Sequence, residues 1–274
     1  MSGSGQASPA PSPAPSRPPS YAAPPWRAWA ALTRVELLLT TRRGENLLVT
    51  LAIPIGLLVF LAQVPLLPAP DGGVGRLEAL VPGILALAVI STGLVSLGIA
   101  TAFERESGML KRLGGAPLPR WALVGAKASA VAVTTALQVV LVGAVALLLG
   151  WHPDGGPAIA LLTAVPWLAL GVAAFAGLGL LLAGRLRPEI VLALANGLYL
   201  LCLLAGGVIV PLDRLPDFVA VPASVLPPAL LADLLRGALV AGGATVPLEA
   251  LGLTAWALGL IAAAVYCFRV SGEA

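Results

Sequence analysis

The chain has 274 residues, of which 58% are hydrophobic and 11% are charged, and its formal net charge is +3. Soluble globular proteins carry about 25% charged residues, so this composition excludes a cytosolic enzyme, a secreted disulfide-bonded scaffold and a nucleic-acid-binding protein. Several uncharged stretches are long enough to cross a lipid bilayer, which takes about 20 residues each. We therefore expect an all-α polytopic membrane protein.

Two segments precede the first long apolar stretch. Residues 1–25 contain eight prolines and six serines, a composition that cannot offset its own ordering entropy and predicts a disordered cytoplasmic tail. Residues 26–46 predict a helix along the cytoplasmic membrane surface, with an ordinary basic flank as the alternative. A helix over this range would carry Trp26 and Trp29 near its start, Arg27, Arg34 and Thr41 on one stripe, and Leu32, Val35 and Leu39 on another side.

Six apolar segments make up a predicted transmembrane domain over residues 47–268, and residues 269–274 form a short C-terminal tail. The predicted spans are 47–67, 79–102, 121–149, 158–183, 190–210 and 246–268. With these spans, 13 of the 16 Lys and Arg residues fall on the side of the two termini, and Arg76, Arg214 and Arg236 fall on the other. Because cytoplasmic loops are enriched in basic residues, we expect both termini in the cytoplasm.

The connection between spans five and six, residues 211–245, is too apolar for a free loop and contains five prolines. Five prolines break the segment too often for one crossing, so it predicts one or two short helices that dip into the outer leaflet. Asp233 and Arg236 are three residues apart and would pair on one helical face. A seventh crossing is the alternative.

Motifs for catalysis or cofactor binding are missing from the sequence. It contains no Gly-x-x-x-x-Gly-Lys phosphate loop, no His-Glu-x-x-His and no nucleophile elbow. His152 is the only histidine, and Cys202 and Cys267 both lie in apolar runs. We therefore expect no catalytic residue, no metal site and no directly bound cofactor.

The polar residues inside the predicted spans are mostly uncharged. No acidic residue lies at mid-span, and ion-coupled carriers need such groups, so we expect any transport energy to come from outside the membrane. Small polar side chains in spans two and five could line an amphipathic path, although side chains of this kind also hold membrane helices together. These residues are Ser91, Thr92, Ser96, Asn196 and Tyr199.

The most charged stretch follows span two and reads ERESGMLKRL over residues 104–113. Its acidic start and basic end suit a short helix dipole, Met109 and Leu113 give it an apolar ridge, and Gly114 and Gly115 end it. The pattern predicts a lever that transmits motion from a docked protein. A solvated basic loop is the alternative.

The order of these segments resembles the type-2 ABC-transporter permeases, the membrane subunits of bacterial exporters. The resemblance covers about Trp26 to Arg269 and rests on two motifs. The first, after span two, places Glu104, Arg105, Glu106, Gly108, Leu110, Lys111 and Leu113 as the family does. The second, after span five, places Gly206, Gly207, Pro211, Leu215, Pro216, Pro227 and Arg236 as the family does, but has Pro227-Pro228-Ala229-Leu230 where the family often has an aromatic residue.

This resemblance implies a permease in the bacterial plasma membrane that pairs with a second copy or a related permease. It would bind no ATP itself and would be driven by a separate ATP-binding-cassette ATPase subunit, for export of a drug-like, antibiotic or other amphipathic substrate. It implies an ATPase-coupling role for Glu104, Arg105, Glu106, Gly108, Met109, Lys111 and Leu113. It also implies an outer gate or re-entrant region at Gly206, Gly207, Pro211, Leu215, Pro216 and Arg236. A self-sufficient secondary carrier and a non-transporting membrane component are the alternative functions.

Overall fold

The computed structural model describes residues 25–42, 44–64, 75–108, 120–153, 155–210, 212–240 and 247–270. Within these ranges every regular element is a helix, and no strand is present. The expected fold class, an all-α polytopic membrane protein, is confirmed. The tail at residues 1–24 and most of the segment after span two lie outside the described residues.

Five helical segments in the described residues are long and apolar enough to cross a membrane. They are the continuous run of α3 (Arg76–Ile90), η2 (Ser91–Ser96) and α4 (Leu97–Glu106), followed by α6 (Arg120–Leu148), α7 (Pro157–Arg185), α8 (Pro188–Ala205) and α11 (Pro247–Val270). These segments lie at the positions predicted for spans two to six. The first predicted span falls on α2 (Gly44–Gln63), whose apolar part Thr50–Gln63 is shorter than the others, so that span stays a prediction.

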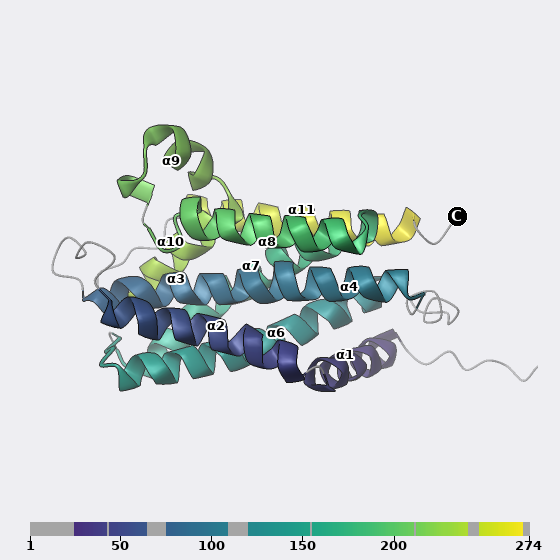
Figure 1. Cartoon of the computed structure of the whole chain (residues 1–274), viewed down its shortest axis with the longest axis horizontal. Coiled ribbons are helices and arrows are strands. Elements are labelled where there is room, and N and C mark those ends of the chain that lie inside the picture. The colour runs from purple at the N-terminus through teal and green to yellow at the C-terminus, as the bar shows by residue number, and fades with distance from the viewer. Residues whose placement is uncertain are drawn as a thin grey trace, which may run out of the picture.

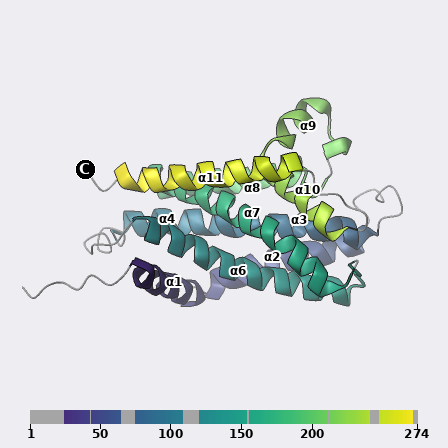
Figure 2. The same cartoon turned by 180° about the vertical axis from the view of Figure 1, so that it is seen from behind.

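The long helices run side by side, up and down a bundle (Figure 1). Helix α1 (Pro25–Arg42) and the last turn of α11 lie at the same end, together with the end of α4 and the start of α6. We call this end the termini end. Seen from behind, α9 (Asp217–Ser224) and α10 (Pro227–Leu239) lie toward the opposite end (Figure 2).

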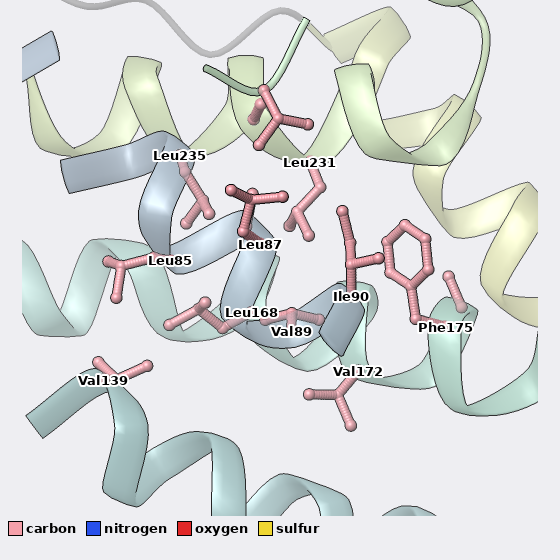
Figure 3. Close-up of a cluster of buried hydrophobic side chains, with 14 of the residues drawn as sticks. Leu85, Leu87, Val89, Ile90, Val139, Leu168, Val172, Phe175, Leu231 and Leu235 are labelled. Carbon is pink, nitrogen blue, oxygen red and sulfur yellow. The ribbon is translucent and has the colours of Figure 1, made fainter. Parts of the chain in front are cut away.

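Helix α3 forms the centre of the bundle. Every residue from Leu80 to Ile90 is buried, and α3 contacts α2, α6, α7 and α10. Figure 3 shows Leu87 close to Leu231 of α10, and Ile90 close to Phe175 of α7. A helix that is apolar on all sides is buried on all sides, which explains this central position.

Close packing between α7 and the middle of the second span depends on glycine. A Cβ atom placed on Gly179 of α7 would lie 2.4 Å from the backbone carbonyl oxygen of Gly93 in η2. Inside a bilayer, helices associate through close van der Waals contact at small residues rather than through the hydrophobic effect. The two backbones therefore touch where a larger residue would hold them apart.

The segment between the last two spans forms two short helices, as the sequence predicts. Helix α9 (Asp217–Ser224) and helix α10 (Pro227–Leu239) are bent by 81° relative to each other. Pro227 and Pro228 occupy the first positions of α10, where the missing N–H has no helical partner to lose. Because of this bend the pair is not one straight crossing, and α10 packs against α3, α7 and α11.

Of the apolar residues expected on one side of α1, Leu32 packs against α6 and Val35 does not, and the position of the helix on the membrane surface stays a prediction. Leu32 is buried in a cluster with Ala122 and Ala126 of α6, whereas Val35 is 44% exposed. The ring of Trp29 lies against Gly125 of α6. The face that meets α6 therefore follows residues 29, 32 and 36, which share one side of a helix because three or four residues make about one turn.

Candidate functional site

A buried lysine joins three helices near the termini end. The Nζ of Lys127 in α6 lies 2.7 Å from Glu104 Oε2 at the end of α4 and 2.8 Å from Glu36 Oε1 of α1. The side chain of Lys127 is 1% exposed, and those of Glu104 and Glu36 are 7% and 14% exposed. We call these three residues the charge triad. Ionised, they carry one excess negative charge.

The triad places one ionisable side chain inside a predicted span, and no acidic residue lies at mid-span, as expected. Lys127 lies near the start of predicted span 121–149. A charged side chain inside a membrane segment requires a partner or an aqueous contact. Here two carboxylates from other helices are its partners.

The three charged residues that end α4 face different surroundings. Glu104 faces the triad, while the guanidinium of Arg105 donates to the backbone carbonyls of Gly184 and Leu186 at the end of α7. The last carbonyls of a helix lack intrahelical donors, and a cation there also interacts favourably with the helix dipole. Glu106 is exposed. The end of α4 is thus anchored to α6 on one side and to α7 on another, with Glu106 available to solvent or a partner.

A second polar contact lies deeper in the bundle. The hydroxyl of Thr92 donates to Gln138 Oε1 of α6 at 2.8 Å, and Gln138 Nε2 donates to the backbone carbonyl of Thr50 in α2 at 3.0 Å. Thr92 belongs to η2, a turn of π-helix within an otherwise α-helical span. Such turns are rare and occur frequently at functional sites.

A cavity of about 60 Å³ extends between the charge triad and this deeper contact. It has room for several water molecules, and its wall offers the polar partners that buried water needs. The polar residues that line it are Glu36, Thr40, Thr50, Thr92, Ser96, Glu104, Lys127 and Thr134. The cavity lies among helices of one chain, between α1, α2, the second span and α6.

The region after α8 is held by one arginine. Arg236 of α10 pairs with Asp233, as expected, and also donates to the carbonyls of Gly207 and Val208, the latter at 2.9 Å. Gly207 has a φ of +68°, and a Cβ there would lie 2.7 Å from the Leu212 side chain, so glycine is required on both grounds. Gly206 is buried at the end of α8.

The remaining residues of the expected outer gate lie nearby in sequence and structure. Leu215 is half-buried after the short turn Leu212–Arg214, and Pro216 caps the start of α9. Pro211 lies outside the described residues. The gate role of this region stays a prediction.

The expected coupling residues fall into two groups. Glu104, Arg105 and Glu106 are placed as described above, and Gly108 follows α4 with a φ of +72°. Met109, Lys111 and Leu113, like Leu110, lie outside the described residues. Their coupling role stays a prediction.

The five expected path-lining residues lie on η2 and α8, and their path-lining role stays a prediction. Thr92 and Ser96 line the cavity, and Ser91 is half-buried beside them in η2. Asn196 is exposed on α8 and donates to the carbonyl of Leu192 in its own helix, while Tyr199 is half-buried on α8. The bond of Thr92 to Gln138 supports the alternative that it links helices.

Sequence reasoning missed Glu36 and the role of Lys127. One signal was available, because Lys127 lies seven residues beyond Arg120 in an otherwise apolar stretch, where a lysine that turns inward requires a carboxylate nearby. Nothing in the sequence identifies Glu36 as one of those carboxylates, since it precedes Lys127 by 91 positions.

The fold and these contacts define a helical membrane protein with a polar interior near its termini end. The family model described as ABC-2 type transporter matches residues 27–240, and the chain belongs to this family. It is a membrane-embedded permease component of an ABC transporter. A comparison with curated proteins gives no match.

Proposed function

We propose that the chain is the permease subunit of an ATP-driven exporter and works as a pair, either with a second copy or with a related permease. Separate ATP-binding-cassette subunits dock at its termini end and hydrolyse ATP, so the permease neither binds ATP directly nor catalyses a reaction. The observation that carries this proposal is the family match over residues 27–240. The resemblance of residues 104–113 to the coupling segment of the family adds to it.

The end of α4 supports a coupling role for this region. Glu104 and Arg105 anchor α4 to α6 and to the end of α7, so a force on the segment that follows is passed directly to two spans. Glu106 remains exposed at the same end. An anchored helix end beside an exposed charge fits a docking point for a partner subunit.

The location follows from the distribution of basic residues. With 13 of 16 Lys and Arg residues on the termini side of the predicted topology, we place both termini in the cytoplasm. The membrane is the bacterial plasma membrane. For the substrate, the apolar bundle with few mildly polar residues favours a drug-like, antibiotic or other amphipathic molecule over a charged polymer.

The experiment is an affinity purification of the tagged permease from its native membrane in a mild detergent, with ATP hydrolysis measured on the eluate. We expect an ATP-binding-cassette subunit to co-purify and to hydrolyse ATP. Recovery of the permease alone would contradict the proposal.

A self-sufficient secondary carrier is the second candidate function. The charge triad and its cavity favour it, since carboxylates and lysines inside a bundle are the groups that bind protons or ions in carriers. This function predicts that dissipating the proton and sodium gradients stops transport while ATP remains. The exporter function predicts that transport continues.

A further inference from the structure

The charge triad contains more carboxylates than the lysine needs. One carboxylate would neutralise Lys127, and Glu104 at 2.7 Å already does so. Glu36 adds a second carboxylate at 2.8 Å from another helix, and burying an extra charge carries a desolvation penalty. Glu36 thus joins a third helix, α1, to the Lys127–Glu104 pair.

We propose that Lys127 is a positioning residue for transport, which holds α1, the end of α4 and the start of α6 together as one unit. This unit passes the movement of a docked ATP-binding subunit to the spans. The inference rests on the proposed function and extends it, because it assigns a role in coupling to Lys127 and to helix α1. Lys127 acts through Glu36 and Glu104 and does not touch the substrate or ATP.

The first support is the position of the Glu104–Lys127 pair. Glu104 lies in the last turn of α4 and Lys127 in the second turn of α6, so the pair bridges the two helices that flank residues 109–119 in the sequence. A force applied to that segment reaches α4 and α6 together. Without the bridge, the two helix ends are free to move apart.

The second support is burial. Lys127 is 1% exposed, so water and salt do not compete for its ion pairs as they do at a surface. Breaking one pair leaves an uncompensated charge in the interior, which is strongly unfavourable. The three helices are therefore joined by contacts that persist when the bundle moves.

The third support concerns α1. Trp29 and Leu32 attach α1 to α6 through apolar contacts, which resist sliding poorly because they have no direction. Glu36 adds a directional contact one turn further along the same face. Through Lys127 this contact extends from α1 to α4.

The test is a charge exchange across the triad. In Glu36→Lys, a second cation faces Lys127, and in Lys127→Glu three carboxylates meet. The double variant E36K/K127E restores one cation between two carboxylates, with the cation now on α1. Each variant is reconstituted with the ATP-binding subunit, and transport is measured per ATP hydrolysed.

We expect each single variant to lower transport per ATP hydrolysed at least about 5-fold, the lower range of measured coupling between sites. The double variant should regain most of the transport per ATP hydrolysed. Lys127→Arg, which keeps the cation, should retain most of it. His152→Lys, which introduces a lysine at an exposed site in the loop between α6 and α7, away from the termini end, should leave the ratio unchanged. Normal transport per ATP in Glu36→Lys, or no recovery in a double variant that is folded and bound to its ATPase, overturns the proposal.

A second measurement keeps the test independent of the ATP-binding subunit. Spin labels at Arg34 of α1 and Glu106 of α4, both exposed, report their separation in the purified permease with Cys202 and Cys267 replaced by alanine. We expect a narrow distance distribution in the parent, a broad one in Glu36→Lys, and a narrow one again in E36K/K127E. An unchanged distance distribution in Glu36→Lys contradicts the proposal that the charge triad holds α1 and α4 together.

The two readouts separate the two proposals. If no ATP-binding subunit associates with the parent permease but the distances respond to charge exchange, the proposed exporter function is wrong. The proposal that the charge triad holds α1, α4 and α6 together is then still supported. If ATP-driven transport is present but neither transport per ATP nor the spin-label distances respond to charge exchange, the proposed role of Lys127 is wrong. The exporter function is then still supported.

Discussion

Gln138 of α6 donates a hydrogen bond of 3.0 Å to the backbone carbonyl of Thr50 in α2. Thr50 lies four residues before Pro54, whose ring nitrogen carries no hydrogen and leaves that carbonyl without its helical donor. In a membrane, a neighbouring helix must supply the missing donor. One side chain of α6 thus compensates for a proline in α2 and also binds Thr92 in the π-helical turn of the second span.

The first prediction concerns this side chain. Gln138→Leu removes the donor for the Thr50 carbonyl and one of the two acceptors of the Thr92 hydroxyl, the other being the carbonyl of Ala88. We expect the free energy of unfolding in detergent to fall by about 1–3 kcal/mol. Gln63→Leu at the exposed end of α2 is the control and should change it little. Equal stability of the two variants would contradict the role of Gln138.

The second prediction concerns the contact between α7 and η2. Gly179→Ala places a methyl group where a Cβ would lie 2.4 Å from the carbonyl of Gly93, so the helices must separate, at a cost of about 1–3 kcal/mol. Gly143→Ala is the matched control, because a Cβ at Gly143 meets no atom within 4 Å. Thermal unfolding should show a lower midpoint for the first variant and no loss for the second.

The third prediction separates two glutamates that are two residues apart. Glu106 is exposed and Glu104 is buried in the triad. We expect Glu106→Lys to weaken binding of the ATP-binding subunit by about 0.2–1 kcal/mol, the range for exposed ion pairs, mainly through slower association, with unchanged permease stability. Glu104→Lys should instead destabilise the permease itself. Binding titrations paired with thermal unfolding distinguish these outcomes, and a destabilised Glu106→Lys permease would be evidence against its exposed position.

The fourth prediction concerns the outer region. Arg236→Met removes the donors for the carbonyls of Gly207 and Val208 and leaves Asp233 without this partner. Because Arg236 is partly exposed, we expect a loss of only about 1–2 kcal/mol in the free energy of unfolding. Arg34→Met, on the exposed side of α1, should be neutral. Protease sensitivity of the segment after α8 should increase in the first variant alone.

Sequence patterns located the long helices well. The predicted spans 121–149 and 158–183 differ by at most two residues at each end from Arg120–Leu148 and Pro157–Arg185. The agreement is close because a long apolar stretch in a membrane protein is stable mainly as a helix that crosses the bilayer. The prolines likewise indicated two short helices between the last spans. These features depend on local composition, which the sequence displays directly.

The polar interior was not predictable in the same way. A lysine near the end of a span can extend to the membrane surface or turn inward, and the sequence does not show which. For Lys127 the outcome depends on Glu36 and Glu104, which lie on two other helices. The π-helical turn at Ser91–Ser96 has no local sequence pattern either, and its partner Gln138 lies on α6.

The order of the triad along the chain bears on how the protein enters the membrane. Glu36 and Glu104 are synthesised before Lys127, so both carboxylates are already present when the helix that carries the lysine reaches the bilayer. The lysine therefore has counter-charges as soon as α6 leaves the insertion machinery, and it need not face lipid alone. The carbonyls that Arg105 binds belong to residues 184 and 186 and appear only later, so the end of α4 takes its final position after α7 has been made.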